Sequence, residues 1–499
     1  MGLPSRKRVR LPIPFLVLPL VLASYPAAQA PPPPAGISAA ARRALQRDIQ
    51  EILDREALDR AEWGILVRSL RTGQTIYAFN PGKLLMPGST LKILTLAAAA
   101  ERLGWDYTYR TEVFAAGPID AGVLKGDLIV VGSGDPSIMD GSHLLEMWAD
   151  TLLSAGIRAI DGRIIGDDSA FDHVPFGPGW TWEDLAGRDG APVGALEFNE
   201  NVAAAIITPG AERGRPAAVA ITPEYAGLTI DNDVVTTGAG TAPSVEITRL
   251  PGTTRISLRG SVPFGAQPAT RVVSVANPTV YFASAFRAAL VSRGISVGGA
   301  AIDIHDLADP PARTGMPLVA YDSPPLATLA TRLMKMSQNL YAESLLKTLG
   351  GTEGTPSWAM SVGVEREVLT EWGIPEDDVV QVDGSGLSRY NYVTAGTLVA
   401  VLTHIHQDET LRAPFEASLP IAGRDGTLAA RLAGTAAENN VRAKTGSLAN
   451  ARSMAGFVTS ADGEPLVFAI LSNNYGANPE MAVSAIDAIA ARIAEFKLR

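Results

Sequence analysis

The 499-residue sequence contains no cysteine, and this absence removes several classes of chemistry. Without thiols the chain has no disulfides, no thiolate metal ligands, no cysteine nucleophile and no acylated cysteine as a membrane anchor. Histidine is scarce, with five residues in all. His404 and His406 are two residues apart and diverge on the helix expected there, so they do not indicate a metal site. We expect no metal and no cofactor.

Long hydrophobic runs are also missing. No stretch after residue 30 reaches the roughly 18 apolar residues that a membrane-spanning helix needs. The first 30 residues combine a basic start, an apolar stretch at 11–23 and the small residues Ala28 and Ala30, which is typical of a secretory signal peptide. Pro31 is an awkward residue directly after that cleavage site. We expect an exported protein, periplasmic or extracellular, with no integral membrane segment once residues 1–30 are removed.

Basic side chains are in the minority, with 42 Lys and Arg against 52 Asp and Glu, a net charge of −10. Removing the leader's four basic residues leaves 38 against 52, a net charge of −14. An acidic chain argues against a nucleic-acid partner and is compatible with a substrate that carries amines. The sequence also lacks a Gly-x-Ser-x-Gly elbow and a Gly-x-Gly-x-x-Gly loop, so hydrolase-elbow and dinucleotide-binding readings have no support.

Strand and helix patterns at the two ends of the chain predict a common sheet. Short connections between the C-terminal strands imply antiparallel pairing, with terminal helices on one face and the helix-rich stretch 324–411 on the other. The predicted strands cover residues 63–70, 75–79, 441–447, 453–459 and 465–472, and the predicted helices cover 38–58, 89–103 and 479–497.

The middle of the chain differs in composition. Residues 112–318 are rich in Gly, Pro, Val, Ile and Thr in short alternating runs, which favours β structure with turns. We predict an α+β fold in which a mainly-β insertion interrupts a domain made of an antiparallel sheet flanked by helices. The expected boundaries are a signal peptide at 1–30, the first part of the main domain at 31–110, the insertion at 111–322 and the second part at 323–499.

Three short motifs carry the chemistry, and their order matters more than any one of them. Ser89 and Lys92 form Ser-x-x-Lys, and a helical i, i+3 spacing lets the amine reach the hydroxyl. Ser337 and Asn339 form Ser-x-Asn. Lys444 opens the strand sequence Lys-Thr-Gly-Ser, which continues with Thr445, Gly446 and Ser447. Gly446 removes a side chain where another group must approach closely.

Each motif alone is weak, and the chain contains decoys. Ser344 also fits Ser-x-x-Lys, but no chain-breaking turn precedes it, so we expect a structural role. Ser472 fits Ser-x-Asn at the end of a strand, where we expect a turn or helix cap. Asp167 and Asp168 are adjacent acids that point to opposite sides of a strand, and we expect turn and surface roles rather than acid–base catalysis.

The ordered trio resembles the signature of penicillin-binding proteins and serine β-lactamases. The 248 residues between Ser89 and Ser337 exceed what a compact β-lactamase needs. They resemble instead the insertion of the class C low-molecular-mass penicillin-binding proteins, the D-alanyl-D-alanine carboxypeptidase/endopeptidase family of the penicillin-binding protein 4 type. Shared segments include residues 126–136, 166–169, 179–182, 198–201, 383–389 and 423–428.

The resemblance implies a role for each motif residue. Ser89 is the acylated nucleophile and Lys92 its neutral base, while Ser337, held by Asn339 and Lys444, relays a proton to the leaving amine. The amides of Ser89 and Ser447 form the oxyanion hole, and such donors contribute about 3–4 kcal/mol each to lowering a barrier. The hydroxyls of Thr445 and Ser447 bind the terminal carboxylate of the substrate.

The implied substrates are peptidoglycan peptides that end in D-Ala-D-Ala or are cross-linked as D-Ala–diaminopimelate, and β-lactam antibiotics acylate the same serine. Diaminopimelate carries an ammonium group, and the family places an Asp after its Gly-Trp-x-Trp segment. The matching position here is Asp184, which we expect to bind that ammonium. The glycine-rich loop that holds Asp383 and Ser385 is expected to shape the wall of the cleft through its backbone.

Two alternatives stay open at this point. A secreted β-lactamase would need a group that activates water for fast deacylation, and the sequence does not identify one. A catalytically silent wall-binding protein would have no need of three intact motifs. Rapid penicillin turnover would favour the first alternative, and an inert Ser89 the second.

Overall fold

The two ends of the chain build one antiparallel sheet. The computed structural model describes residues 37–351, 355–476 and 478–499, so the expected signal peptide lies outside the described residues. The order across the sheet is β2-β1-β22-β21-β20, and every neighbouring pair is antiparallel. The strands are β1 (Glu62–Ser69), β2 (Thr75–Phe79), β20 (Arg442–Leu448), β21 (Ala451–Thr459) and β22 (Pro465–Asn473).

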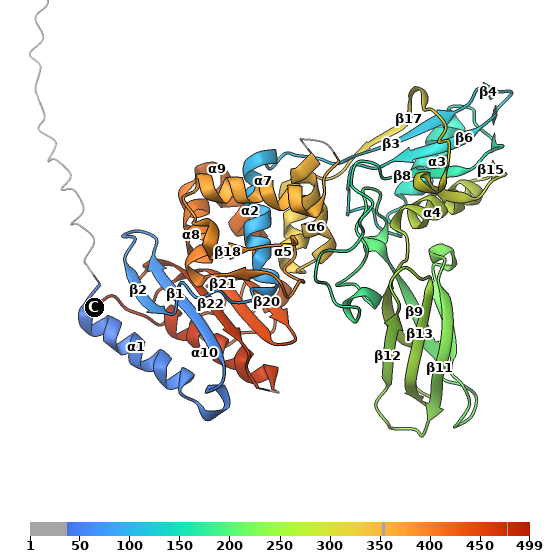
Figure 1. Cartoon of the computed structure of the whole chain (residues 1–499). Helices are drawn as coiled ribbons and strands as arrows, with labels where there is room; N and C mark the ends of the chain where they lie inside the picture. Colours follow the sequence, from blue (N-terminus) through green and yellow to red (C-terminus); the bar gives the residue numbers. More distant parts are fainter. Residues whose placement is uncertain (1–36, 352–354, 477) are drawn as a thin grey trace, which may run out of the picture. The chain divides into compact units, whose positions relative to one another are not determined.

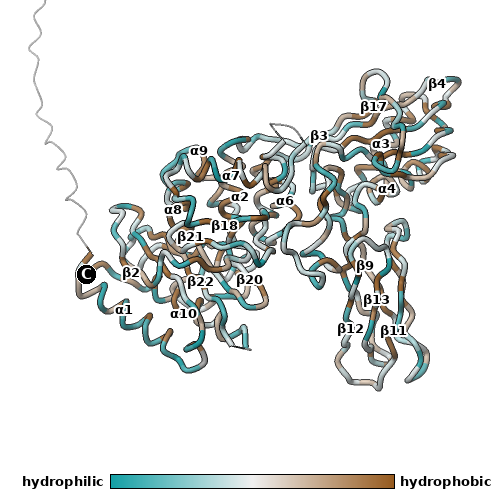
Figure 2. Tube along the Cα trace, viewed as in Figure 1, coloured by the Kyte–Doolittle hydropathy of each residue, from teal (hydrophilic) through white to brown (hydrophobic). Residues whose placement is uncertain are grey.

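Both faces of this sheet are buried by helices, which explains why β22 is apolar on nearly every residue (Figure 1). The terminal helices α1 (Ala39–Leu53) and α10 (Pro479–Ala494) contact each other and pack on one face. In Figure 2, α1 shows both teal and brown segments, as expected of a helix with one buried side. The other face is covered by α2 (Lys92–Leu103), α5 (Leu326–Lys335), α6 (Asn339–Gly350), α7 (Trp358–Glu371), α8 (Ala395–Gln407) and α9 (Glu409–Ser418).

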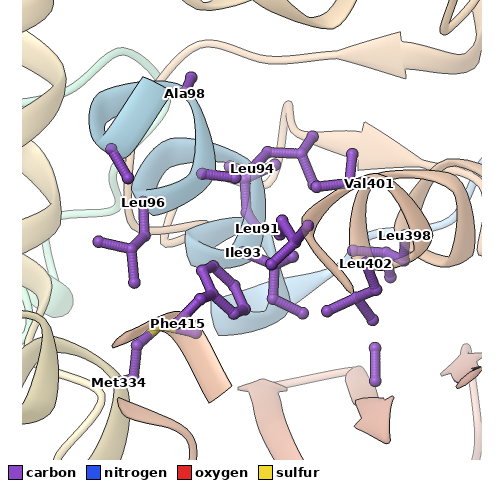
Figure 3. Close-up of a cluster of buried hydrophobic side chains, with 14 of the residues drawn as sticks. Leu91, Ile93, Leu94, Leu96, Ala98, Met334, Leu398, Val401, Leu402 and Phe415 are labelled. Carbon is purple, nitrogen blue, oxygen red and sulfur yellow. The ribbon is translucent and has the colours of Figure 1, made fainter. Parts of the chain in front are cut away.

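Helix α2 is the centre of the second core, and it is the helix that follows the Ser-x-x-Lys serine. Every residue from Thr90 to Ala99 is buried. Figure 3 shows Leu94 of α2 near Val401 of α8, with Phe415 of α9 and Met334 of α5 also close to the helix. A helix without a solvent-exposed face has little freedom to shift, so Lys92 at its first position and the turn before it are held rigidly.

The insertion begins and ends on paired strands. β3 (Arg110–Ala116) and β17 (Thr314–Asp322) are antiparallel, with Arg110 opposite Asp322. They belong to a five-stranded sheet of order β16-β8-β6-β3-β17, which is completed by β6 (Asp127–Val131), β8 (Ile164–Asp167) and β16 (Ala301–Asp303). A small four-stranded sheet lies next to it in the chain, with β4 (Ile119–Asp120), β5 (Val123–Leu124), β7 (Ala159–Ile160) and β15 (Ser296–Val297).

Two three-stranded sheets complete the insertion. The first has the order β10-β9-β14 and the second β11-β13-β12, with β11 and β13 parallel. Their strands are β9 (Val202–Thr208), β10 (Ala218–Thr222), β14 (Ala269–Ser274), β11 (Thr229–Thr237), β12 (Ser244–Arg249) and β13 (Arg255–Pro263). A two-stranded ribbon, β18 (Val379–Val380) with β19 (Tyr392–Val393), lies in the main domain.

The insertion is mainly β, as expected, and two helices, α3 (Leu144–Ser154) and α4 (Pro278–Ser292), add Trp148, Phe282 and Phe286 to its core. The structure corrects two details of the sequence interpretation. Ser472 lies buried inside β22 and not at a turn or cap. Asp167 is buried and paired with Arg313, so it is not a surface acid. Among the described residues, no helix has the length and apolar composition to cross a bilayer.

Candidate active site

Ser89 lies in a tight turn rather than in an α-helix. The expected helix start at Ser89 is wrong by one turn, because Gly88–Leu91 is a 3₁₀ turn and α2 begins at Lys92. Gly88 has φ +53°, and a Cβ there would lie 2.8 Å from the amide nitrogen of Ser447. Only glycine tolerates both the backbone conformation and the close strand, so the sequence Pro-Gly-Ser is what brings Ser89 against β20.

Lys92 is fully buried and donates three hydrogen bonds from its Nζ. The acceptors are the Oγ of Ser89 at 2.9 Å, the Oδ1 of Asn339 at 2.6 Å and the backbone oxygen of Ser385 at 2.8 Å. These acceptors come from three segments that are far apart in the sequence. The 3₁₀ turn thus still delivers the Ser–Lys contact that the i, i+3 spacing predicts.

The second motif faces the third. Ser337 adopts a left-handed backbone (φ +58°) between α5 and α6, and its hydroxyl accepts a hydrogen bond from the Nζ of Lys444 at 2.8 Å. Asn339 is the first residue of α6, and its Nδ2 donates to the backbone oxygen of Asp189 at 2.9 Å. Ser89, Lys92 and Asn339 therefore form one hydrogen-bonded group, and Ser337 with Lys444 forms a second beside it.

Strand β20 provides the third wall of the site. It lies at the edge of the sheet, next to the 3₁₀ turn that carries Ser89. A Cβ on Gly446 would lie 2.2 Å from the backbone oxygen of Pro87 and 3.0 Å from the amide nitrogen of Ser89, so this position requires glycine. Ser447 is exposed, and Thr445 donates to the Oγ1 of Thr427 at 2.7 Å. Residues 420–422 pair with the outer edge of β20 as far as Ala443, and the free edge that follows offers backbone groups to an extended peptide.

The pKa of Lys92 is depressed, so its neutral form is more accessible near neutral pH than that of a lysine in water. Burial lowers the pKa of Lys92 to about 8, against the opposing influence of the acids Glu343, Asp383 and Asp189. Burial also lowers the pKa of Lys444 well below its usual value, and the nearby charge of Lys92 lowers it further. Each buried lysine contacts its own serine, Lys92 contacting Ser89 and Lys444 contacting Ser337, and the depressed pKa values make both amines easier to deprotonate.

A buried acid that sequence reasoning missed lies behind Lys92. Glu343 is fully buried, and its carboxylate accepts the amides of Gly384 at 2.7 Å and Ser385 at 2.8 Å. Burial and the charge of Asp383 raise the pKa of Glu343 to about 8. The available signal was its spacing, because four residues after Asn339 places it on the same face of α6.

The glycine-rich loop is held from inside by Asp383. This carboxylate is fully buried and accepts hydrogen bonds from the amides of Gly386 (2.9 Å) and Ser388 (2.7 Å) and from the side chains of Trp180 (2.9 Å) and Asn391 (2.7 Å). A Cβ at Gly386, where φ is +83°, would lie 2.0 Å from the backbone oxygen of Gly88. The loop shapes the site through its backbone, as expected, and Asp383 fixes that backbone.

Asp184 lies in a short 3₁₀ turn of the insertion and already has partners. Its Oδ2 accepts hydrogen bonds from the amide of Thr181 at 3.2 Å, the hydroxyl of Thr181 at 2.6 Å and the Nη1 of Arg389 at 3.2 Å. Arg389 follows the loop of Asp383, and its pairing with Asp184 was not predicted from the sequence. Both charged side chains of this pair keep part of their surface exposed, 21% for Asp184 and 35% for Arg389.

The decoy serine is separated from its lysine. Ser344 is buried in α6 and donates to Glu197 at 3.1 Å. Lys347 turns instead to Asp172 and to the ring face of Trp358, with its Nζ 4.6 Å from the ring centroid. This arrangement supports the structural role expected for Ser344.

Comparison with known proteins gives consistent matches over nearly the whole chain. Residues 45–495 match the D-Ala-D-Ala carboxypeptidase 3 (S13) family. A D-alanyl-D-alanine carboxypeptidase from Actinomadura sp. (strain R39) is 36% identical over 504 aligned residues, covering 97% of this chain and 89% of the relative. The crystal structure of penicillin binding protein 4 (dacB) from Haemophilus influenzae superposes with a TM-score of 0.78 at 26% identity, covering 89% of this chain and 97% of that one. The same Haemophilus protein also has a structure with a β-lactam bound, for which the TM-score is 0.72 at 25% identity, with 88% of this chain and 97% of that one covered.

The protonation of Lys92 is open to a direct test. We expect acylation of Ser89 by benzylpenicillin to speed up as the pH rises through about 8, because the amine becomes a base only after losing its proton. Lys92→Arg should be nearly inactive, since a guanidinium does not give up its proton. Stopped-flow acylation rates across the pH range measure both effects. An arginine variant with close to the native rate would make Lys92 an electrostatic anchor only.

Glu343 is expected to act as a positioning residue for Lys92. In Glu343→Gln one amide oxygen replaces two carboxylate oxygens, so the Ser385 loop loosens and the maximal acylation rate should fall about tenfold. Losing the acid also removes an influence that raises the pKa of Lys92, so the acidic limb of the pH profile should move to lower pH. Glu371→Gln, an exposed acid on α7, is the matched control. A slower variant with an unmoved profile would restrict Glu343 to a structural role.

Proposed function

The chain belongs to the D-Ala-D-Ala carboxypeptidase 3 (S13) family, and we propose that its active site trims terminal D-alanine from peptidoglycan stem peptides and also opens D-Ala–diaminopimelate cross-links. As a member of this family it is a serine-type D-Ala-D-Ala carboxypeptidase. The observation that carries the proposal is the buried lysine that joins Ser89, Asn339 and the Ser385 backbone.

Acylation begins with Ser89 attacking the carbonyl of the penultimate D-alanine. Lys92 accepts the serine proton, and the amides of Ser89 and Ser447 stabilise the oxyanion. Ser337, which accepts a hydrogen bond from Lys444, passes a proton to the departing amine. Water then hydrolyses the acyl-enzyme and releases the shortened peptide.

The two substrates share the chemistry that the site must recognise. In the terminal dipeptide and in the cross-link, the scissile carbonyl belongs to D-alanine and the leaving amine has a neighbouring carboxylate. A substrate strand beside the free edge of β20 brings that carboxylate towards the hydroxyls of Thr445 and Ser447. One serine centre therefore serves both reactions without a second site.

We further propose that the protein acts outside the cytoplasm, where peptidoglycan is exposed to an exported enzyme. The support is the basic and apolar pattern of residues 1–30. A mature protein that begins at Pro31 would agree with cleavage at the expected site, and mass spectrometry of the N-terminus decides this.

The substrate assay tests the proposal directly. We expect the mature enzyme to release D-alanine from a pentapeptide ending in D-Ala-D-Ala and to split a cross-linked muropeptide dimer, both measured by chromatography and mass spectrometry. Ser89→Ala should lose both activities and the benzylpenicillin adduct on the Ser89 peptide, whereas Ser344→Ala should keep them. An intact dimer alongside released D-alanine would remove the endopeptidase part, and rapid turnover of penicillin would favour a β-lactamase instead.

Asp184 is proposed to select diaminopimelate. Its pair with Arg389 offers one carboxylate and one guanidinium, which complement the ammonium and carboxylate at the end of the diaminopimelate side chain. Both groups remain partly exposed, so a ligand can replace part of their mutual contact.

Asp184→Ala should reduce turnover of a diaminopimelate peptide about ten- to a hundredfold relative to a peptide with an acetylated side-chain amine, which corresponds to about 1.5–3 kcal/mol. Penicillin acylation should remain almost unchanged, because penicillin lacks that side chain. Steady-state kinetics on the two peptides give the ratio. Equal losses on both would make Asp184 a support for the Thr181 turn rather than a specificity residue.

A further inference from the structure

Two of the five histidines, His173 and His305, lie close to Asp168 in the insertion. His305 is far from the other two in the sequence, and no sequence motif connects them. Asp168 directly follows β8, and His305 follows β16 in the 3₁₀ turn Ile304–Asp306. β8 and β16 are parallel neighbours, with Gly166 opposite Asp303, so the segments that leave these strands emerge at the same edge of the sheet. His173 returns to this edge from the loop after Asp168.

The side chains meet as a set of metal ligands would. One ligand atom from each of Asp168, His173 and His305 lies within 4.8 Å of the other two. The Oδ1 of Asp168 and the Nε2 of His305 are 3.1 Å apart, and the two imidazole rings are 4.5 Å apart between centroids. Zinc with ligand bonds of about 2.0–2.1 Å in a tetrahedral site places its ligand atoms roughly 3.3 Å from one another. The Asp168–His305 pair already has this spacing, and the exposed ring of His173 has a nitrogen within 4.8 Å of both.

The carboxylate of Asp168 is held in one orientation, but one of its oxygens lacks a hydrogen bond among the described residues. Its Oδ2 accepts a hydrogen bond from the hydroxyl of Thr279 at 2.7 Å, which fixes the direction of the carboxylate. Its Oδ1 is buried and has no hydrogen-bond partner among the described residues, although the Nε2 of His305 lies 3.1 Å away. A simple ion pair would align an N–H with that oxygen. Two close ligand atoms without this alignment fit a cation that both of them face.

The surroundings add negative charge. A cavity of about 100 Å³ borders Asp168 and His173 and is also lined by Asp172 and Asp303.

We propose that Asp168, His173 and His305 form a binding site for a first-row divalent cation, with Zn²⁺ as the best match. Two imidazoles and one carboxylate are ligands that zinc accepts, and solvent reaches the exposed side of the site to supply a further ligand. This site lies outside the serine chemistry, for which the sequence indicates no metal.

The site's consequence is structural. Asp172, in the same loop, pairs with Lys347 of α6, the helix that begins with Asn339. A cation that holds Asp168 and His173 to His305 therefore fixes the loop that contacts this helix. We expect the cation to stabilise the protein without taking part in acylation.

Metal titration of the full mature chain without a histidine tag tests the proposal. After treatment with a chelator, Zn²⁺ should bind with a stoichiometry of one by calorimetry and should raise the melting temperature. Co²⁺ should give the visible absorption of a site with nitrogen and oxygen ligands. His173→Ala and His305→Ala should each weaken binding at least about tenfold. His143→Ala, a histidine with 79% of its side chain exposed, is the matched control.

Penicillin acylation checks that each variant is folded, since neither histidine takes part in the proposed reaction, and His305→Gln provides a second, more conservative variant. Absence of stoichiometric Zn²⁺ binding by the wild type would overturn the site. Binding that survives in both alanine variants would do the same. Neither result concerns Ser89, so neither result tests the proposed carboxypeptidase and endopeptidase activities.

Discussion

The buried amine of Lys92 is the interaction on which the rest of the active site depends. It is the one atom that contacts the nucleophile Ser89, the Ser-x-Asn residue Asn339 and the glycine-rich loop through Ser385. Removing an ammonium from water is costly unless acceptors surround it. The three acceptors of Lys92 lower the free-energy cost of burying its ammonium. They can do so only when the segments that carry Ser89, Asn339 and Ser385 are folded against one another. The same group therefore joins the three segments of the site, and we propose that it is also the base.

The buried acids around this lysine balance its charge at a distance. Glu343 and Asp383 do not contact the nucleophile, but they hold the backbone amides of the loop that contacts Lys92. Burial raises the pKa of both carboxyls, while burial lowers the pKa of Lys92. The pKa values of Lys92 and Glu343 therefore both lie at about 8, so a change in the charge of either group alters the protonation of the other.

The insertion takes part in this centre although its core is separate. Asp189 accepts a hydrogen bond from Asn339, Trp180 donates to Asp383, and Asp184 pairs with Arg389. Arg332 of α5 pairs with Glu200, a buried acid of the insertion. These contacts join the insertion to the residues around Lys92, and this is the basis for our proposal that the insertion contributes to specificity. The proposed cation site belongs to the same boundary, since its loop pairs with Lys347.

The sequence alone determined the candidate serine, its lysine and the order of the three motifs that the fold brings together, because these depend on local spacing and on glycines that permit close approach, as at Gly88 and Gly446. It also determined the antiparallel sheet, since alternating apolar strands and short turns encode their pairing locally. Only the tertiary structure decided the roles of Glu343, Arg389 and the Asp168–His305 pair. Their partners lie far away in the chain, and burial, which shifts a pKa or leaves an oxygen without a partner, is a property of the packed fold and not of any segment.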